Sequence, residues 1–180
     1  MSSPATKAPS HSGAAEAAFE ALYRSSRDDL FAYVAGLLRD RSAAEDVTAL
    51  AFERAYRKRS RFDPARGSRR AWLFGIARNA ALDELRRRRR TAELIGEPQD
   101  TETAAPEQQA EVALRRAALR QAMSALDGRE RELVSLKFFA GLSNAEIATV
   151  IGTTATNAGT RLHRTVEKLR RACDEVAQRG

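Results

Sequence analysis

The clearest sign of chemistry in the sequence is a stripe of one amide and three cations at helical spacing near the end of the chain. The stripe consists of Asn157, Arg161, Arg164 and Lys168. An asparagine amide can pair with the edge of adenine, whereas arginine and lysine suit guanine edges or phosphates. Thr156 and Thr160 flank Asn157 and can add hydroxyl or methyl contacts. These six side chains are typical of a helix that enters the major groove of DNA.

The residues before this stripe have the spacing of a helix-turn-helix. Ser143 and Glu146 form a capping-box pattern at the start of a helix expected over 144–151. Gly152 suits a tight turn with positive φ, and Thr154 is expected to cap the DNA-reading helix over 155–177. A plain amphipathic hairpin with a solvated basic face is the alternative. Agreement among the caps, the turn and the apolar spacing favours the helix-turn-helix.

A second group of aromatic and cationic residues lies in the first half of the chain, around a loop predicted over 62–68. Aromatic faces and cations together hold bases that have left the DNA stack. This group consists of Arg66, Arg69, Arg70, Trp72 and Arg78. Trp72 also fits the buried side of its own helix, so a core role for it stays open. The five arginines of 86–90 suit phosphate contact or, alternatively, a solvated helix end.

The composition predicts an all-α protein with a polyanionic partner. Ala, Leu, Arg and Glu dominate, which favours helix, and the formal net charge is +7, which favours nucleic acid or an anionic membrane surface. The chain has one cysteine, Cys173, and its two histidines are far apart, so we expect no metal site, cofactor or catalytic residue. No stretch approaches eighteen apolar residues. We therefore expect a cytoplasmic protein that is not an enzyme and uses neither membrane nor small-molecule substrate.

Changes in composition divide the chain into two small helical domains. We expect a disordered tail over 1–18, a first domain over 19–90 and a flexible acidic linker over 91–110. A helix-turn-helix domain is expected over 111–176, with a short tail over 177–180. In the first domain, Ser42 is predicted to cap the second helix. The linker can reach at most ~65–70 Å, which lets the domains contact separate DNA elements.

Two long segments resemble the extracytoplasmic-function (ECF) sigma factors of bacterial RNA polymerase. Residues 44–90, from AEDVTALAFERAYR to DELRRRRR, resemble the promoter-melting domain of that family. Residues 125–171, from ALDGRERELVSLKFFAGLS to TVEKLRR, resemble its −35-reading domain. A stand-alone helix-turn-helix regulator is the alternative function, although its class is not known to have this first half. A basic protein acting on RNA or membranes is a weaker rival, because aromatic-rich sheets and a long basic amphipathic helix are not evident.

The resemblance implies partners and a role for each matching residue. The implied partners are core RNA polymerase, through its clamp and flap, promoter DNA and an anti-sigma factor. The residues implied to bind polymerase are Asp46, Phe52, Arg54 and Tyr56. For the −10 element and melting, the resemblance implies Trp72, Arg78, Asn79 and Arg86, which join Arg66, Arg69 and Arg70 of the aromatic and cationic group. For −35 DNA it implies Arg161 and Arg164, which share the helix face of Thr156, Asn157, Thr160 and Lys168. The chain departs from the family pattern at Ala49, Leu50 and Gly159.

Overall fold

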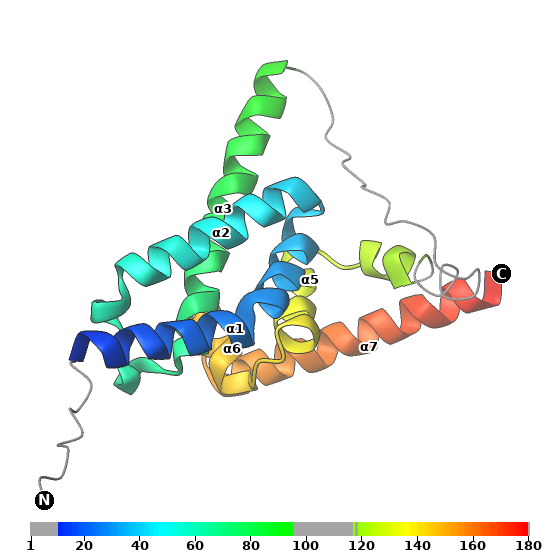
Figure 1. Ribbon diagram of the computed structural model, residues 1–180. Helices are drawn as coiled ribbons and strands as arrows, with labels where there is room; N and C mark the ends of the chain where they lie inside the picture. Colours follow the sequence, from blue (N-terminus) through cyan, green and yellow to red (C-terminus); the bar gives the residue numbers. More distant parts are fainter. Residues whose placement is uncertain (1–10, 96–116, 118, 180) are drawn as a thin grey trace, which may run out of the picture.

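The computed structural model describes residues 11–95, 117 and 119–179, and no strand occurs among these residues. The first segment consists of three long helices and two short 3-10 turns. These elements are α1 (His11–Leu38), α2 (Arg41–Arg57), η1 (Arg59–Arg61), η2 (Pro64–Arg66) and α3 (Arg69–Ile95). Helices α1 and α2 run side by side in opposite directions, and the carboxyl half of α3 projects beyond them (Figure 1).

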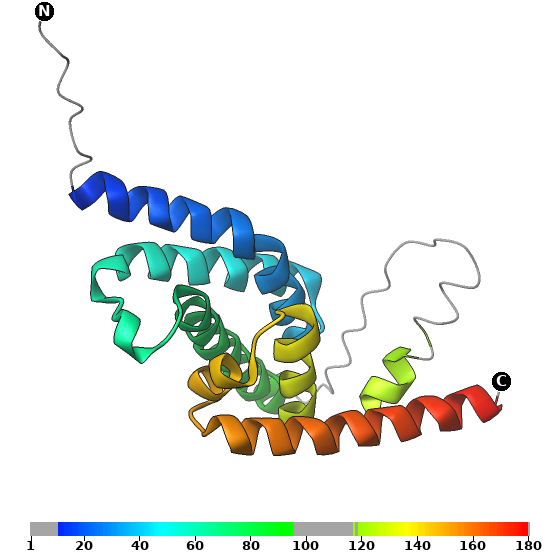
Figure 2. The same ribbon diagram turned by 90° about the horizontal axis from the view of Figure 1, so that it is seen from below.

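The second segment carries the predicted helix-turn-helix. Its elements are α5 (Gly128–Val134), a π-helical turn η3 (Ser135–Phe139), α6 (Asn144–Ile151) and α7 (Ala155–Arg179), and residues 119–124 add a helical turn. Helix α7 forms one edge of the molecule, and its carboxyl half extends away from the other helices (Figure 2). The all-α prediction is confirmed.

Three helix ends differ from the positions predicted from the sequence. Helix α1 begins at His11, inside the predicted tail, because residues 14–18 are rich in alanine, the strongest helix former. Helix α3 continues to Ile95, within the predicted linker, and α7 runs to Arg179. The rest of the predicted linker and residues 1–10 lie outside the described residues.

The cap of α2 is also different from the prediction. Asp40, not Ser42, is the N-cap residue, and its carboxylate accepts a hydrogen bond from the Ala43 backbone N–H at 3.0 Å. Asp40 follows Arg39, which turns the chain with a positive φ of 53°. Arg88 of α3 binds the same carboxylate at 2.8 Å, so one aspartate both starts α2 and ties it to α3.

The two segments pack into one continuous hydrophobic core. Leu30, Tyr33 and Phe74 of the first segment belong to the same cluster of buried residues as Leu136 and Ile147 of the second. Gly36 allows the close approach of α1 to η3, because an added Cβ would lie 3.1 Å from the Ser135 hydroxyl. Helix α6 packs against both α3 and α7, and α5 packs against α7 and α1 (Figure 2). The structure therefore fixes the two predicted DNA-reading parts against each other.

Candidate DNA and polymerase interfaces

The helix-turn-helix has the local geometry that its sequence predicts. Ser143 and Glu146 form a complete capping box at the start of α6. Gly152 ends α6 in the left-handed conformation with φ of 72°, a region that glycine enters without steric cost. The Thr154 hydroxyl accepts a hydrogen bond from the Asn157 backbone N–H at 3.2 Å. These caps fix the direction in which α7 leaves the turn.

Most residues predicted to read −35 DNA lie on the exposed side of α7. Thr156, Asn157, Thr160 and Arg164 are exposed, and Arg161 is half-buried. Lys168 is different, because its ammonium group pairs with Glu130 of α5 at 2.7 Å. Lys168 therefore holds α7 to its own segment in this structure. His163, for which the sequence predicts no DNA contact, is also exposed on α7.

Asn157 is the best positioned of these side chains for base recognition. Its amide Nδ2 donates to the Thr153 hydroxyl at 2.7 Å, which holds the side chain in the first turn of α7. An asparagine amide has two N–H groups and one carbonyl oxygen. One N–H and the carbonyl stay available, and these are the groups that adenine pairs with in the major groove.

The predicted melting site contains one cation and two aromatic rings in contact, with the rings tilted by 58° to each other. We call this ring pair the Phe62–Trp72 stack. The centroids of the Trp72 and Phe62 rings lie 5.6 Å apart. The Arg69 guanidinium lies over the Phe62 ring, 4.5 Å from its centroid. Trp72 is partly buried against the core, so part of its side chain packs inside the protein and part stays exposed to solvent. Arg66 and Asn79 are exposed nearby in sequence. The sequence prediction places Phe62 in a loop and gives it no DNA role, although an aromatic residue beside arginines is a signal for one.

Two other predicted melting residues are engaged with the second segment. Arg78 binds Glu132 with its Nε at 2.6 Å and its Nη2 at 3.3 Å, while Glu132 is almost completely buried. Arg70 binds Asp29 at 2.6 Å and donates to the Ala140 carbonyl at 2.5 Å. In this arrangement neither guanidinium is free to contact DNA.

The arginine run at the end of α3 is largely paired within the protein. Arg86 pairs with Asp83 at 3.0 Å, Arg87 with Glu84 at 2.7 Å, and Arg88 with both Glu84 and Asp40 at 2.8 Å. Hydrogen bonds from Arg87 and Arg88 lower the pKa of Glu84 to about 2. Arg89 and Arg90 are exposed. The run is therefore in part an anchor for α2 and α3.

The predicted polymerase-binding residues are distributed over α2. Asp46 is exposed, Arg54 is half-buried, and Tyr56 is partly exposed with its ring 5.1 Å from that of Phe19. Phe52 is only 7% exposed and packs against Tyr23 at 4.7 Å. Burial restricts Phe52 to a supporting position behind the exposed face.

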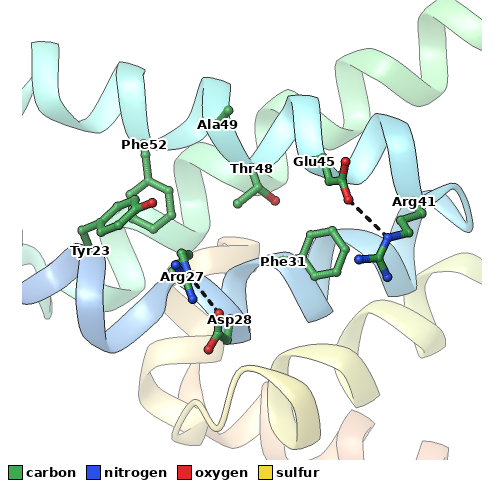
Figure 3. A pocket seen from close by; sticks show the side chains of 9 residues that line it. All are labelled: Tyr23, Arg27, Asp28, Phe31, Arg41, Glu45, Thr48, Ala49 and Phe52. Atoms are coloured by element: carbon green, nitrogen blue, oxygen red, sulfur yellow. Dashed lines mark hydrogen bonds and ion pairs between the residues drawn. The ribbon is translucent and has the colours of Figure 1, made fainter.

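An open groove of about 820 Å³ lies between α1 and α2 beside this face (Figure 3). Aromatic side chains form much of its wall, and ion pairs of Arg27 with Asp28 and of Arg41 with Glu45 lie along it. The Thr48 hydroxyl in the groove is buried and has no hydrogen-bond partner among the described residues. The groove is lined by Tyr23, Arg27, Asp28, Phe31, Arg41, Glu45, Thr48, Ala49 and Phe52.

Comparison with known proteins shows the family of this chain. Residues 22–91 match the model of Sigma-70 region 2, and residues 116–169 match that of Sigma-70 region 4. The chain is 33% identical over 172 residues to the ECF RNA polymerase sigma factor SigL of Mycobacterium tuberculosis, covering 93% of this chain and 96% of that one. The chain belongs to the ECF sigma factors. The sigma factor CarQ of Myxococcus xanthus is 35% identical, over 90% of this sigma factor and 92% of CarQ.

A solved structure shows the same fold. The sigma factor RpoE of Bartonella quintana, in complex with the anti-sigma factor NepR, matches 87% of this sigma factor and 97% of that chain with a TM-score of 0.74 and 23% identity. Within the described part of this sigma factor, no helix is long and apolar enough to cross a membrane. The same residues contain no cluster of three or more His, Cys, Asp or Glu side chains suited to a metal ion.

Proposed function

We propose that this sigma factor reads the −35 element with the first turns of α7, opens the −10 element at the Phe62–Trp72 stack, and binds core polymerase through α2. The observation that carries the proposal is the exposed row of Thr156, Asn157, Thr160 and Arg164 after a capped helix-turn-helix. The amide near the helix start suits base edges, and Arg164, two turns later, suits a phosphate. Sigma factors direct promoter-specific transcription. The proposal assigns each step of that activity to particular residues of this chain.

The polymerase clamp is proposed to bind the exposed face of α2 around Asp46. Ala49 is exposed and Leu50 half-exposed one turn after Asp46, so this face is less polar than the family pattern. The flap is proposed to bind the second segment, where Phe138 is 61% and Phe139 43% exposed. Exposed aromatic residues of this size are typical of protein contact surfaces.

Contact of Arg70 and Arg78 with promoter DNA requires the two segments to separate. Both guanidinium groups bind the second segment in the structure, through Ala140 and Glu132. We propose that polymerase binding favours the separated arrangement, because polymerase contacts both segments. An anti-sigma factor, by analogy with NepR on RpoE, is proposed to favour the joined one. The protein is proposed to act in the cytoplasm, where polymerase and promoters meet.

Co-purification with core polymerase tests the clamp assignment. Asp46→Arg is expected to abolish co-purification while the circular dichroism spectrum stays helical. Asp174→Arg, which reverses an exposed acid on α7, is the matched control and should bind polymerase as the wild type does. Run-off transcription on genomic fragments with wild-type protein then identifies promoters. Duplex binding without polymerase, together with no run-off product, would instead support a stand-alone regulator.

A further inference from the structure

Four cations converge on one hollow at the carboxyl end of α2. Arg54, Arg57, Lys58 and Arg61 line a pocket of about 420 Å³, and every lining residue carries a positive charge. Their numbering follows the i, i+3, i+4, i+7 pattern of a single helical stripe, which continues from α2 into η1. At ~30 Å³ for each water molecule, the pocket has room for a hydrated anion. We call these four residues the cation pocket.

Three of the four cations in the cation pocket have no acidic partner among the described residues. Elsewhere on the helices, Arg24, Arg41 and Arg86 each pair with an acid three or four residues away. In the cation pocket, only Arg57 has such a partner, Glu53 at 3.4 Å. Arg54, Lys58 and Arg61 form no ion pair within the part of the chain that the structure describes. Like charges at this spacing repel one another, and a bound anion removes that repulsion.

The dipole of α2 accounts for only part of this arrangement. Cations are favourable near the carboxyl end of a helix, where Arg54 and Arg57 occupy the last turn. The dipole does not require four cations to face a common hollow. Arg59, the remaining cation of this stretch, is turned elsewhere, because its guanidinium lies 4.0 Å from the Tyr56 ring and donates to the Tyr56 carbonyl at 2.8 Å.

The cation pocket and the aromatic rings of the melting site are adjacent in the chain. Arg61 precedes Phe62 in the chain, and the Phe62 ring lies 5.6 Å from Trp72. A single strand bound by stacking needs cations along its backbone beside the aromatic faces. Arginine offers a fork of donors to phosphate oxygens, and lysine offers a mobile point charge.

We propose that the cation pocket binds backbone phosphates of the DNA strand whose bases meet the Phe62–Trp72 stack. This inference rests on the proposed melting function. It adds Arg57, Lys58 and Arg61 to the DNA-binding residues, and it gives Arg54 a DNA contact in place of the polymerase contact that the family pattern implies. The ligand is a run of phosphodiesters, recognised by charge and not by base sequence.

Neutral phosphates in DNA test the proposal. The variant R54Q/K58Q/R61Q keeps polar side chains with the same first three carbons and removes three charges. The control R24Q/R129Q/R171Q removes three exposed charges elsewhere. The promoter is first identified by selection with the wild-type holoenzyme, and a fragment of it is made with an unpaired bubble. The affinity of each protein, in complex with core polymerase, is then measured on this fragment. One methylphosphonate replaces one phosphate of the open strand at a time. Wild type and the charge-matched control should lose affinity severalfold at the same few consecutive phosphates.

The R54Q/K58Q/R61Q variant should bind less tightly and be insensitive to methylphosphonates at those same positions, because the contact is already absent. Its slope of log affinity against log salt should be shallower by about 2, since each phosphate contact contributes about 0.7 for single strands. Unchanged methylphosphonate sensitivity in this variant would overturn the proposal, as would an equal loss in the control. Loss of co-purification with core polymerase would show that these cations contact polymerase instead.

If wild-type holoenzyme does not form, the proposed function is refuted. Phosphate binding by the cation pocket can still be measured on the chain alone. The full chain alone would then be titrated with a single-stranded 20-nucleotide thymidine oligomer over a range of salt. The same difference in salt slope between wild type and R54Q/K58Q/R61Q, absent in the control, would support the cation pocket. Equal slopes in all three proteins would overturn it.

Discussion

Arg78 of α3 and Glu132 of α5 form an ion pair at 2.6 Å that joins the predicted melting helix to the helix-turn-helix segment. Tyr33 of α1 donates to the same carboxylate at 3.3 Å. Burial, and then the charge of Glu132, raise the pKa of Tyr33 well above its ordinary value, so the phenol stays protonated. One buried acid therefore receives hydrogen bonds from two helices of the other segment.

Removal of this acid should weaken the joined structure. Glu132→Ala leaves Arg78 and Tyr33 without their acceptor, and we expect a loss of about 2–3 kcal/mol of unfolding free energy, below the ~3–5 kcal/mol of a fully buried pair. Urea denaturation followed by circular dichroism measures the loss. A double-mutant cycle with Arg78→Ala should give a coupling of at least about 1 kcal/mol. Additive losses would show that the two side chains do not stabilise each other.

Asn157→Ala should change promoter preference at one base pair. The amide that Thr153 positions is expected to pair with adenine, so the variant should lose about 1–3 kcal/mol at one −35 position and relax the preference there. Holoenzyme binding to a set of single-base −35 variants measures this. Arg164→Ala is the comparison, and it should weaken every sequence alike and make the salt slope shallower by about one. The same uniform loss in both variants would contradict the assignment.

Trp72→Ala should impair strand opening more than stability. Since Trp72 is only partly buried, we expect the loss of unfolding free energy to fall below the ~3–5 kcal/mol of a fully buried tryptophan. Closed complexes should form, while permanganate-reactive thymines at the start site should decrease. Trp72→Phe retains a ring against Phe62 and should recover part of the reactivity. A Trp72→Ala protein that is unfolded in thermal melts would identify Trp72 as a core residue.

Gly159→Ala should stabilise the protein. Glycine inside a helix costs about 1 kcal/mol relative to alanine, and Gly159 lies within α7. The new Cβ would approach the Asn144 amide nitrogen to 3.1 Å, but Asn144 is exposed and can rotate away. We expect a gain of about 0.5–1 kcal/mol in urea denaturation. In an Asn144→Ala background, Gly159→Ala should raise the unfolding free energy by at least as much. A smaller increase there would show that the contact with the Asn144 amide does not limit the stabilisation.

Acid should destabilise the protein in part through Glu84. The pKa of Glu84 is about 2 in the folded protein against 4.5 as the ordinary value, so its stabilising contribution is full above pH 4.5 and is lost as the pH falls toward 2. Glu84→Gln should lower stability at neutral pH and reduce the pH dependence between 4.5 and 2. Thermal melts over this range measure both effects. An unchanged slope in Glu84→Gln would assign the acid sensitivity to other groups, such as Asp40, which also binds Arg88.

The sequence predicted the features that depend on neighbours in the chain. The capping box of Ser143 and the turn at Gly152 need only a few adjacent residues, and the structure confirms both. The pairing of Lys168 with Glu130 joins residues 38 positions apart, and that of Arg78 with Glu132 spans 54. Such contacts depend on how the helices pack, which helical periodicity alone does not specify. The prediction of Ser42 as the cap of α2 was wrong. Asp40 takes that position after the turn at Arg39, and its carboxylate also binds Arg88, 48 positions away, a contact that the local sequence does not reveal.

The shared core of the two segments has a consequence for temperature. Separation of the segments would bring apolar side chains such as Leu136 and Ile147 into water, and such exposure carries a positive heat-capacity change. The free energy of separation is then a curved function of temperature, with a maximum and a decline on either side of it. If polymerase binds only the separated form, the fraction of sigma factor able to bind it varies with temperature, even when the total amount of protein is constant.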